Sequence, residues 1–147
     1  MPAPSIRRIV YGSSSPVLLG ADAVADILRV SRANNAADGV TGALLYAEGN
    51  FLQVLEGVPE VVARTYERIC RDPRHRRVLT FLDQQTDRRL FAEWSMALVR
   101  PDALSADDRA SVRSLYDVDA SDLGPVRHLL RSFREMATGA LPGAVRA

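Results

Sequence analysis

The sequence is short of several residue types, and each shortage narrows what the protein can be. It has no lysine and a single cysteine, Cys70, so no disulfide can form within one chain, and a reducing cytoplasm is expected. No apolar run approaches the roughly 20 residues that a membrane span needs. The N-terminus lacks the character of a signal peptide, which also favours a cytoplasmic location.

An excess of charge is missing as well. The formal net charge is +1, which gives little field for attracting nucleic acid. Arginine without lysine, together with abundant alanine, suggests a GC-rich bacterial genome.

What is present is ordinary for a globular protein. Hydrophobic residues make up 47% and charged residues 25% of the 147 residues, enough for one folded domain without disulfides or metals. The pattern predicts a principal domain over residues 1–100 and a helical extension and tail over 101–147.

Hydrophobic periodicity predicts the elements of the first half of this domain. A strand over 6–11 precedes a serine-rich loop and a helix over 21–34, with Gly39 among its stop signals. Apolar runs over 40–46 and 51–56 predict two strands joined by a hairpin loop.

The second half repeats this alternation. Pro59 suits the first turn of a second helix, whose inner stripe is expected to include a buried Cys70. Two strands follow at about 77–84 and 93–99. The resulting order, β-α-β-β-α-β-β, predicts a ferredoxin-like α+β sandwich with both helices on one sheet face.

The other sheet face is predicted to be apolar too, so it needs a cover. A helix is expected at about 105–116, and a second, C-terminal helix has an apolar stripe. We interpret the two as a cap on the sheet or as a dimer surface. The stripe consists of Val126, Leu129, Leu130, Phe133 and Met136.

Three polar side chains fall at positions where the pattern predicts burial. Gln53 lies in a strand that is apolar on both faces, and a buried amide needs hydrogen-bond partners, either from the backbone or from a ligand. Tyr11 ends its strand with an inward ring, as core tyrosines do. Asn35 continues the inward stripe of the first helix, although Asn34 or Asn35 could equally be a C-cap.

A charged segment follows the second helix. Arg68 and Asp72 are spaced i, i+4, as in an exposed ion pair. Arg74 and His75 continue a positive cluster that could hold phosphates or form a solvated turn.

The remaining reactive side chains form no catalytic pattern. His75 lies in the charged turn, His128 in the C-terminal segment, and Cys70 is expected to be buried, so no nucleophile has a base beside it. Trp94 and Met96 alternate on one face of the last predicted strand, where core packing is the default interpretation.

Taken together, five segments resemble the BLUF family of blue-light sensors over about residues 5–100. No single segment is decisive, but all occur in order and at the family's spacing. They are Ile9-Val10-Tyr11-Gly12-Ser13; Ser31-Arg32-Ala33-Asn34-Asn35 followed by Gly39-Val40-Thr41-Gly42; Phe51-Leu52-Gln53-Val54-Leu55-Glu56-Gly57; Asp72-Pro73-Arg74-His75; and Phe91-Ala92-Glu93-Trp94-Ser95-Met96.

The resemblance implies one FAD, bound non-covalently between the two helices, with FMN or riboflavin as substitutes. It assigns amide, charged and apolar side chains to the ring edge, the phosphates and the ring faces. The implied contacts are Asn34, Asn35 and Gln53 with Arg68 and Asp72 for the ring edge, Arg32, Arg74 and His75 for phosphates or ribose, and Ile27 and Ile69 for the ring faces.

The resemblance also implies a light-driven mechanism without substrate turnover. Tyr11 would give an electron and a proton to the excited flavin, and the Gln53 amide would then change its hydrogen bonds. Trp94 or Met96 would carry this change to the C-terminal helices, and which of them lies beside Gln53 is open. The expected partners are flavin, a second copy in a homodimer or larger oligomer, and a downstream protein, but neither nucleic acid nor membrane.

Three other functions are compatible with this topology. One is a small ferredoxin-like enzyme and another is an RNA-recognition module, which would need exposed aromatic and basic residues on the sheet. The third is an oligomeric scaffold in which Gln53 and Asn35 are satisfied core amides.

Overall fold

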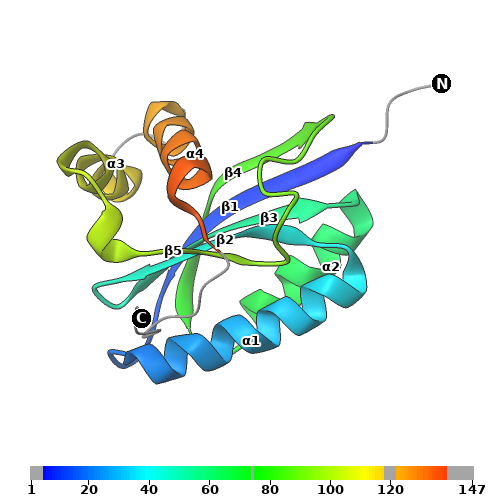
Figure 1. Ribbon diagram of the computed structural model, residues 1–147, viewed down its shortest axis with the longest axis horizontal. Helices are drawn as coiled ribbons and strands as arrows, with labels where there is room; N and C mark the ends of the chain where they lie inside the picture. The colour runs from blue at the N-terminus through cyan, green and yellow to red at the C-terminus, as the bar shows by residue number, and fades with distance from the viewer. Residues whose placement is uncertain (1–4, 74, 118–121, 139–147) are drawn as a thin grey trace.

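A five-stranded sheet forms the centre of the computed structural model, which describes residues 5–73, 75–117 and 122–138 (Figure 1). Neighbouring strands are antiparallel except β2 and β5, which are parallel. The sheet has the predicted ferredoxin-like arrangement, with β5 added beside β2. The strands are β1 (Ile6–Ser14), β2 (Thr41–Ala47), β3 (Asn50–Gly57), β4 (Arg76–Thr86) and β5 (Ala97–Val99), in the order β4-β1-β3-β2-β5.

Two helices cover one face of the sheet, α1 (Ala21–Asp38) and α2 (Pro59–Cys70) (Figure 1). Gly39 ends α1 with a left-handed backbone at φ 69°, as predicted. The helix is longer than the predicted 21–34, so Asn34 and Asn35 lie inside its last turns and do not stop it. Pro59 begins α2, where its missing N–H costs nothing.

The C-terminal helices α3 (Ala106–Asp117) and α4 (Gly124–Met136) cover the opposite face, after a short 3₁₀ turn, η1 (Pro101–Ala103) (Figure 1). The apolar stripe of α4 is buried against the sheet within the same chain. The predicted cap is therefore confirmed, and this stripe is not available as a dimer surface.

Each sheet face has its own hydrophobic core, because both faces of β1, β2 and β3 are apolar and covered by helices. We call them the cap core and the α1/α2 core. The cap core includes Val10, Leu45, Leu52, Val54, Phe91, Val126, Leu129 and Phe133, and the α1/α2 core includes Ile9, Tyr11, Leu28, Leu44, Phe51, Leu55, Val62 and Met96.

The last strand differs from its prediction. β5 is limited to Ala97–Val99, because only these residues pair with β2, whereas 93–99 was predicted. Trp94 instead belongs to a turn in which its N–H donates to Phe91 O at 3.2 Å. Trp94 and Met96 therefore do not share a strand face: Trp94 packs on the cap core, and Met96 lies in the α1/α2 core.

The prediction that Cys70 is buried was wrong, since its side chain is exposed. The buried stripe of α2 runs through Val62 and Thr65 to the half-buried Ile69. Cys70 is the last residue of the helix and lies at the margin of this stripe, where its side chain is not packed against the sheet.

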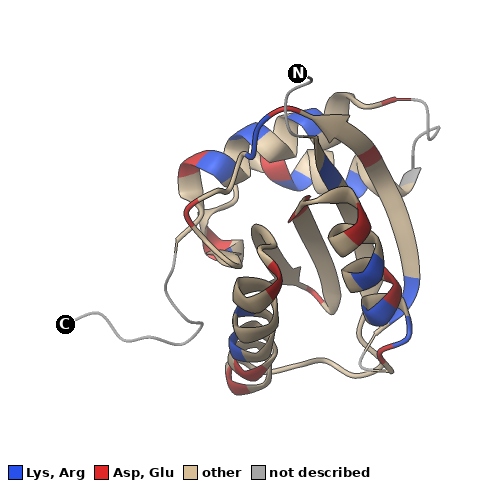
Figure 2. Cartoon of the chain, turned by 90° about the vertical axis from the view of Figure 1, so that its right-hand side faces the viewer, with Lys and Arg blue, Asp and Glu red and all other residues tan. Residues whose placement is uncertain are grey.

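Basic and acidic side chains are interspersed along the helices, as on an ordinary solvated surface (Figure 2). No helix within the described ranges is long and apolar enough to cross a membrane.

Candidate functional site

The site is organised around Tyr11 and Gln53, which β1–β3 pairing places directly opposite each other. Both side chains are buried on the α1/α2 side, at 3% and 5% exposure. The Tyr11 hydroxyl donates a hydrogen bond to Gln53 Oε1. Burial raises the pKa of Tyr11 far above its usual value, with a smaller contribution from nearby Tyr66, so the hydroxyl keeps its proton at physiological pH.

The second partner of the Gln53 amide is Met96. Gln53 Nε2 lies 3.5 Å from Met96 Sδ, and Met96 is completely buried. Both partners of this buried amide are therefore side chains on the α1/α2 side of the sheet. Met96, rather than Trp94, is the residue beside Gln53.

The C-terminal half of α1 holds the segment that contains Met96. Asn35 is 3% exposed, and its Nδ2 donates to Ser95 O at 2.9 Å. Arg32 Nε donates to Met96 O at 2.8 Å, and burial lowers the pKa of this guanidinium. Asn34 is exposed on the same part of the helix.

Two adjoining cavities lie between α1 and α2, of about 70 and 120 Å³. They share Ser31, Gln53, Ile69 and Asp72 in their walls, so Gln53 reaches both. The first is also lined by Tyr11, Ile27, Leu44, Phe51 and His75, and the second by Val30, Asn34, Asn35, Thr65 and Arg68.

The charged segment after α2 closes one end of the first cavity. His75 Nδ1 is 2.8 Å from Ser13 Oγ, and its Nε2 is 2.5 Å from Ile69 O, so the imidazole is held between β1 and α2. Arg68 is half-exposed, and its guanidinium lies 4.0 Å from the carboxylate of Asp38 on α1. Arg74 lies outside the described residues.

Trp94 is the predicted site residue that lies away from this site. It packs on the cap core, where Arg134 of α4 is 5.9 Å from its ring centroid. The turn preceding β5 sends Trp94 and Met96 to opposite sides of the sheet, which strand alternation alone did not predict.

The site also contains residues that sequence reasoning did not select. Ser31 and Tyr66 were visible only as members of helical stripes, and Tyr66 lies with its ring centroid 5.3 Å from that of Tyr11. Thr65 is buried in the wall of the second cavity and carried no signal beyond its position on α2.

Comparison with known proteins gives a consistent result. The family model for BLUF, "Sensors of blue-light using FAD", matches residues 6–97. The solved dark-state structure of BlrB, a BLUF protein, superposes with a TM-score of 0.74 at 29% identity, covering 90% of this chain and 98% of BlrB. The ground state of BlsA superposes with a TM-score of 0.69 at 26% identity, covering 95% of this chain and 91% of BlsA.

Longer proteins match through the same region. The alpha subunit of photoactivated adenylate cyclase from Euglena gracilis is 36% identical over 93 residues, which are 62% of this chain but 9% of that protein. The blue light- and temperature-regulated antirepressor BluF of Escherichia coli is 33% identical over 75 residues, covering 51% of this chain and 19% of that protein. This chain therefore spans a small part of these relatives. From the match over residues 6–97 and the arrangement around Gln53, the chain belongs to the BLUF family of flavin-binding blue-light sensors.

Proposed function

We propose that this chain binds FAD non-covalently between α1 and α2 and detects blue light through Tyr11 and Gln53. The observation that carries the proposal is the buried hydrogen bond between these two side chains. Gln53 lines both cavities, and Tyr11 lines the first. FMN and riboflavin have the same ring and would serve in its place.

The residues around the cavities suit a flavin ring chemically. Its flat faces need apolar walls, and Ile27 and Ile69 lie on opposite helices. Its polar edge needs donors and acceptors, which the amides of Asn34, Asn35 and Gln53 offer. Each cavity is smaller than the roughly 300–1,000 Å³ of ligand pockets, but the two adjoin and share four wall residues.

Charged residues at the margins complete the proposed contacts. Arg68 and Asp72 line the second cavity and would bind the ring edge. Arg32, Arg74 and His75 would bind ribose or phosphates, for which arginine is well suited. Arg32 and His75 already have partners in the chain, so these contacts require an exchange of hydrogen bonds.

The mechanism follows from the hydrogen-bonding capacity of Gln53. When bound, the flavin supplies an oxidant on absorbing blue light. Tyr11, whose hydroxyl holds its proton, would give an electron and a proton and then take both back, so that its phenol is restored while the Gln53 amide stays rotated. Rotation of the Gln53 amide would turn Nε2 towards Tyr11 and Oε1 towards Met96 Sδ, and because sulfur here can only accept, that contact would be lost.

Two backbone hydrogen bonds join β5, the strand that follows Met96, to the residues after the C-terminal helix. Leu98 of β5 pairs with Thr138, directly after α4, through N–O distances of 2.7 and 2.9 Å. We propose that movement of Met96 shifts β5 and, through this pairing, the end of α4. In this proposal residues 1–100 sense light and 101–147 transmit the signal.

The output is proposed to be non-enzymatic, through a partner protein or a change of assembly, and the likeness to the BLUF protein BlrB supports this. Because the α4 stripe is buried internally, an oligomer would use another surface. A cytoplasmic location stays a prediction.

The decisive test is the substitution Tyr11→Phe, compared with wild type and with Tyr66→Phe. Wild type should bind FAD and show a small, reversible red shift of its flavin absorption under blue light. Tyr11→Phe should bind flavin without the shift, because the donor to Gln53 is gone, whereas Tyr66→Phe should retain it. A normal shift in Tyr11→Phe contradicts the role of Tyr11, and a wild type that cannot be reconstituted with FAD contradicts the cofactor.

A further inference from the structure

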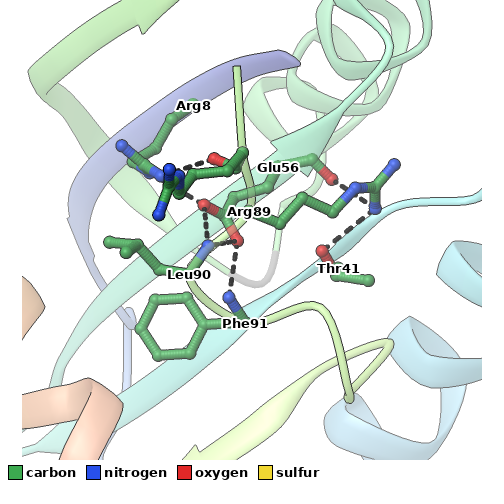
Figure 3. Close-up of polar contacts among 7 residues, drawn as sticks. Arg8, Thr41, Glu56, Arg89, Leu90 and Phe91 are labelled. Atoms are coloured by element: carbon green, nitrogen blue, oxygen red, sulfur yellow. Dashed lines mark hydrogen bonds and ion pairs between the residues drawn. The ribbon is translucent and has the colours of Figure 1, made fainter. Parts of the chain in front are cut away.

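Glu56 is a completely buried carboxylate that does not line either cavity. Strand alternation places it on the cap side of β3, whereas Gln53 faces α1 and α2. In Figure 3 its oxygens accept hydrogen bonds from Arg8 Nε at 2.8 Å and from the backbone nitrogens of Leu90 and Phe91, each at 2.9 Å. All three partners are donors, and only a carboxylate offers two oxygens that accept and never donate.

Two arginines fix this segment of chain: Arg8 binds its backbone, and Arg89, which belongs to the segment, binds residues at the start of β2. Arg8 Nη2 donates to Arg88 O at 3.1 Å, so the arginine that pairs with the carboxylate also holds the start of the segment. Arg89 Nη1 donates to Gly39 O at 2.8 Å. It also donates to Thr41 Oγ1 at 3.0 Å, a contact drawn in Figure 3. We call Glu56, Arg8 and the bound residues 88–91 the Glu56 clamp.

The far end of this segment is bound at the candidate flavin site. Ser95 O accepts from Asn35, and Met96 O accepts from Arg32. Met96 Sδ lies beside the amide of Gln53. The connection between β4 and β5 is therefore fixed at its start on the cap side and at its end on the α1/α2 side.

We infer that Glu56 is a positioning residue for Met96, an inference that rests on the proposed function. With 88–91 held, Met96 can shift only within a short stretch of chain, which restricts its position against Gln53. Without the clamp the whole connection can adjust to either orientation of the amide. The barrier between the arrangement of Gln53 and Met96 formed after illumination and the arrangement in darkness is then lower. The illuminated arrangement therefore decays faster.

The test is Glu56→Gln, which keeps the size of the side chain but turns an NH₂ group towards donors. We expect unchanged flavin binding and an unchanged dark spectrum, because Glu56 does not line the cavities. Recovery in darkness should be about threefold to tenfold faster, the range that a lost coupling contact gives. Amide hydrogen exchange should increase in residues 88–96 and not in α1 or α2. Arg89→Met is a milder variant, with the same direction expected, if Glu56→Gln does not fold.

Leu82→Ala is the matched control, since it removes cap-core packing on β4 while the hydrogen bonds of the clamp do not involve Leu82. Recovery within twofold of wild type, slower recovery, or an equal acceleration in Leu82→Ala at matched melting temperature would overturn the inference. A wild type without photochemistry would refute the proposed function instead. The exchange comparison needs no light and still tests whether Glu56 holds residues 88–96.

Discussion

At the scale of single residues, the two neighbours of Gln53 make different hydrogen bonds to its amide. Tyr11 donates to its oxygen, and Met96 Sδ is the acceptor for its nitrogen. Met96→Leu keeps the volume and removes the acceptor, which weakens the dark orientation of the amide. We expect dark recovery about twofold to fivefold slower, from a loss of about 0.5–1 kcal/mol. Absorbance after a blue pulse measures it.

Trp94→Phe is the control for this change. Trp94 lies on the other side of the sheet, so its replacement should leave the recovery rate close to that of wild type. If Trp94→Phe slows recovery and Met96→Leu does not, the assignment of Met96 as the neighbour that responds to Gln53 is wrong.

Gly42 lies where the fold leaves no space for a side chain. A Cβ at this position would lie 1.8 Å from Val54 O of the adjoining strand, whereas at Gly20 nothing lies within 4 Å. Gly42→Ala should therefore destabilise the protein by about 3 kcal/mol or more, because β2 and β3 must separate. Gly20→Ala should cost under about 1 kcal/mol. Urea unfolding measures both, and equal midpoints would contradict the predicted clash.

At the scale of elements, the unit that stands out is the α3–α4 pair, joined at the buried Asp108. Its carboxylate accepts from Ser132 Oγ at 2.6 Å and from Ser105 N at 2.9 Å, and His128 Nε2 lies at 2.8 Å. A serine nucleophile would donate to the imidazole, but here the serine and the histidine both point at the carboxylate. This geometry joins two helices and does not activate a nucleophile.

The lowered pKa of Asp108 predicts that the folded state loses stability in acid. Burial alone would raise its pKa, but the hydrogen bonds from Ser132, Ser105 and His128 outweigh burial and lower the pKa to about 2. A lowered pKa in the folded state stabilises the protein above the unfolded value of about 3.9, by about 2 kcal/mol, and this is lost as the pH falls towards 2. Unfolding midpoints of wild type and Asp108→Asn should differ most at neutral pH and converge near pH 2. Parallel curves would contradict the prediction.

At the scale of the whole molecule, flavin binding and folding should be linked. The site lies between α1 and α2 and exists only in the folded chain. FAD should therefore bind the folded state and not the unfolded state, which stabilises the fold. At a concentration about 100 times the dissociation constant the gain is about 2.7 kcal/mol, or roughly 5–10 °C in melting temperature for a chain of this size. Thermal unfolding with and without FAD measures this, with adenosine diphosphate, which lacks the isoalloxazine ring of the flavin, as the control. An equal rise with adenosine diphosphate would contradict a site built for the ring.

Much of the fold was predictable because it depends on local patterns. The alternation of apolar residues predicted the strands, Gly39 and Pro59 marked a helix end and a helix start, and the α4 stripe required a buried face. Gln53 was conspicuous because an amide is costly to bury without partners, and the structure provides them from Tyr11 and Met96.

The sequence by itself determined the element order, the two apolar sheet faces and the family, because periodicity and motif spacing are properties of the chain. Only the tertiary structure decided that the α4 stripe caps its own sheet, since a stripe does not specify which surface covers it. It also decided that a turn places Trp94 and Met96 on opposite sides of the sheet, and that Glu56 binds the backbone of Leu90 and Phe91. These contacts join segments far apart in the chain, and no local pattern records which segments will meet.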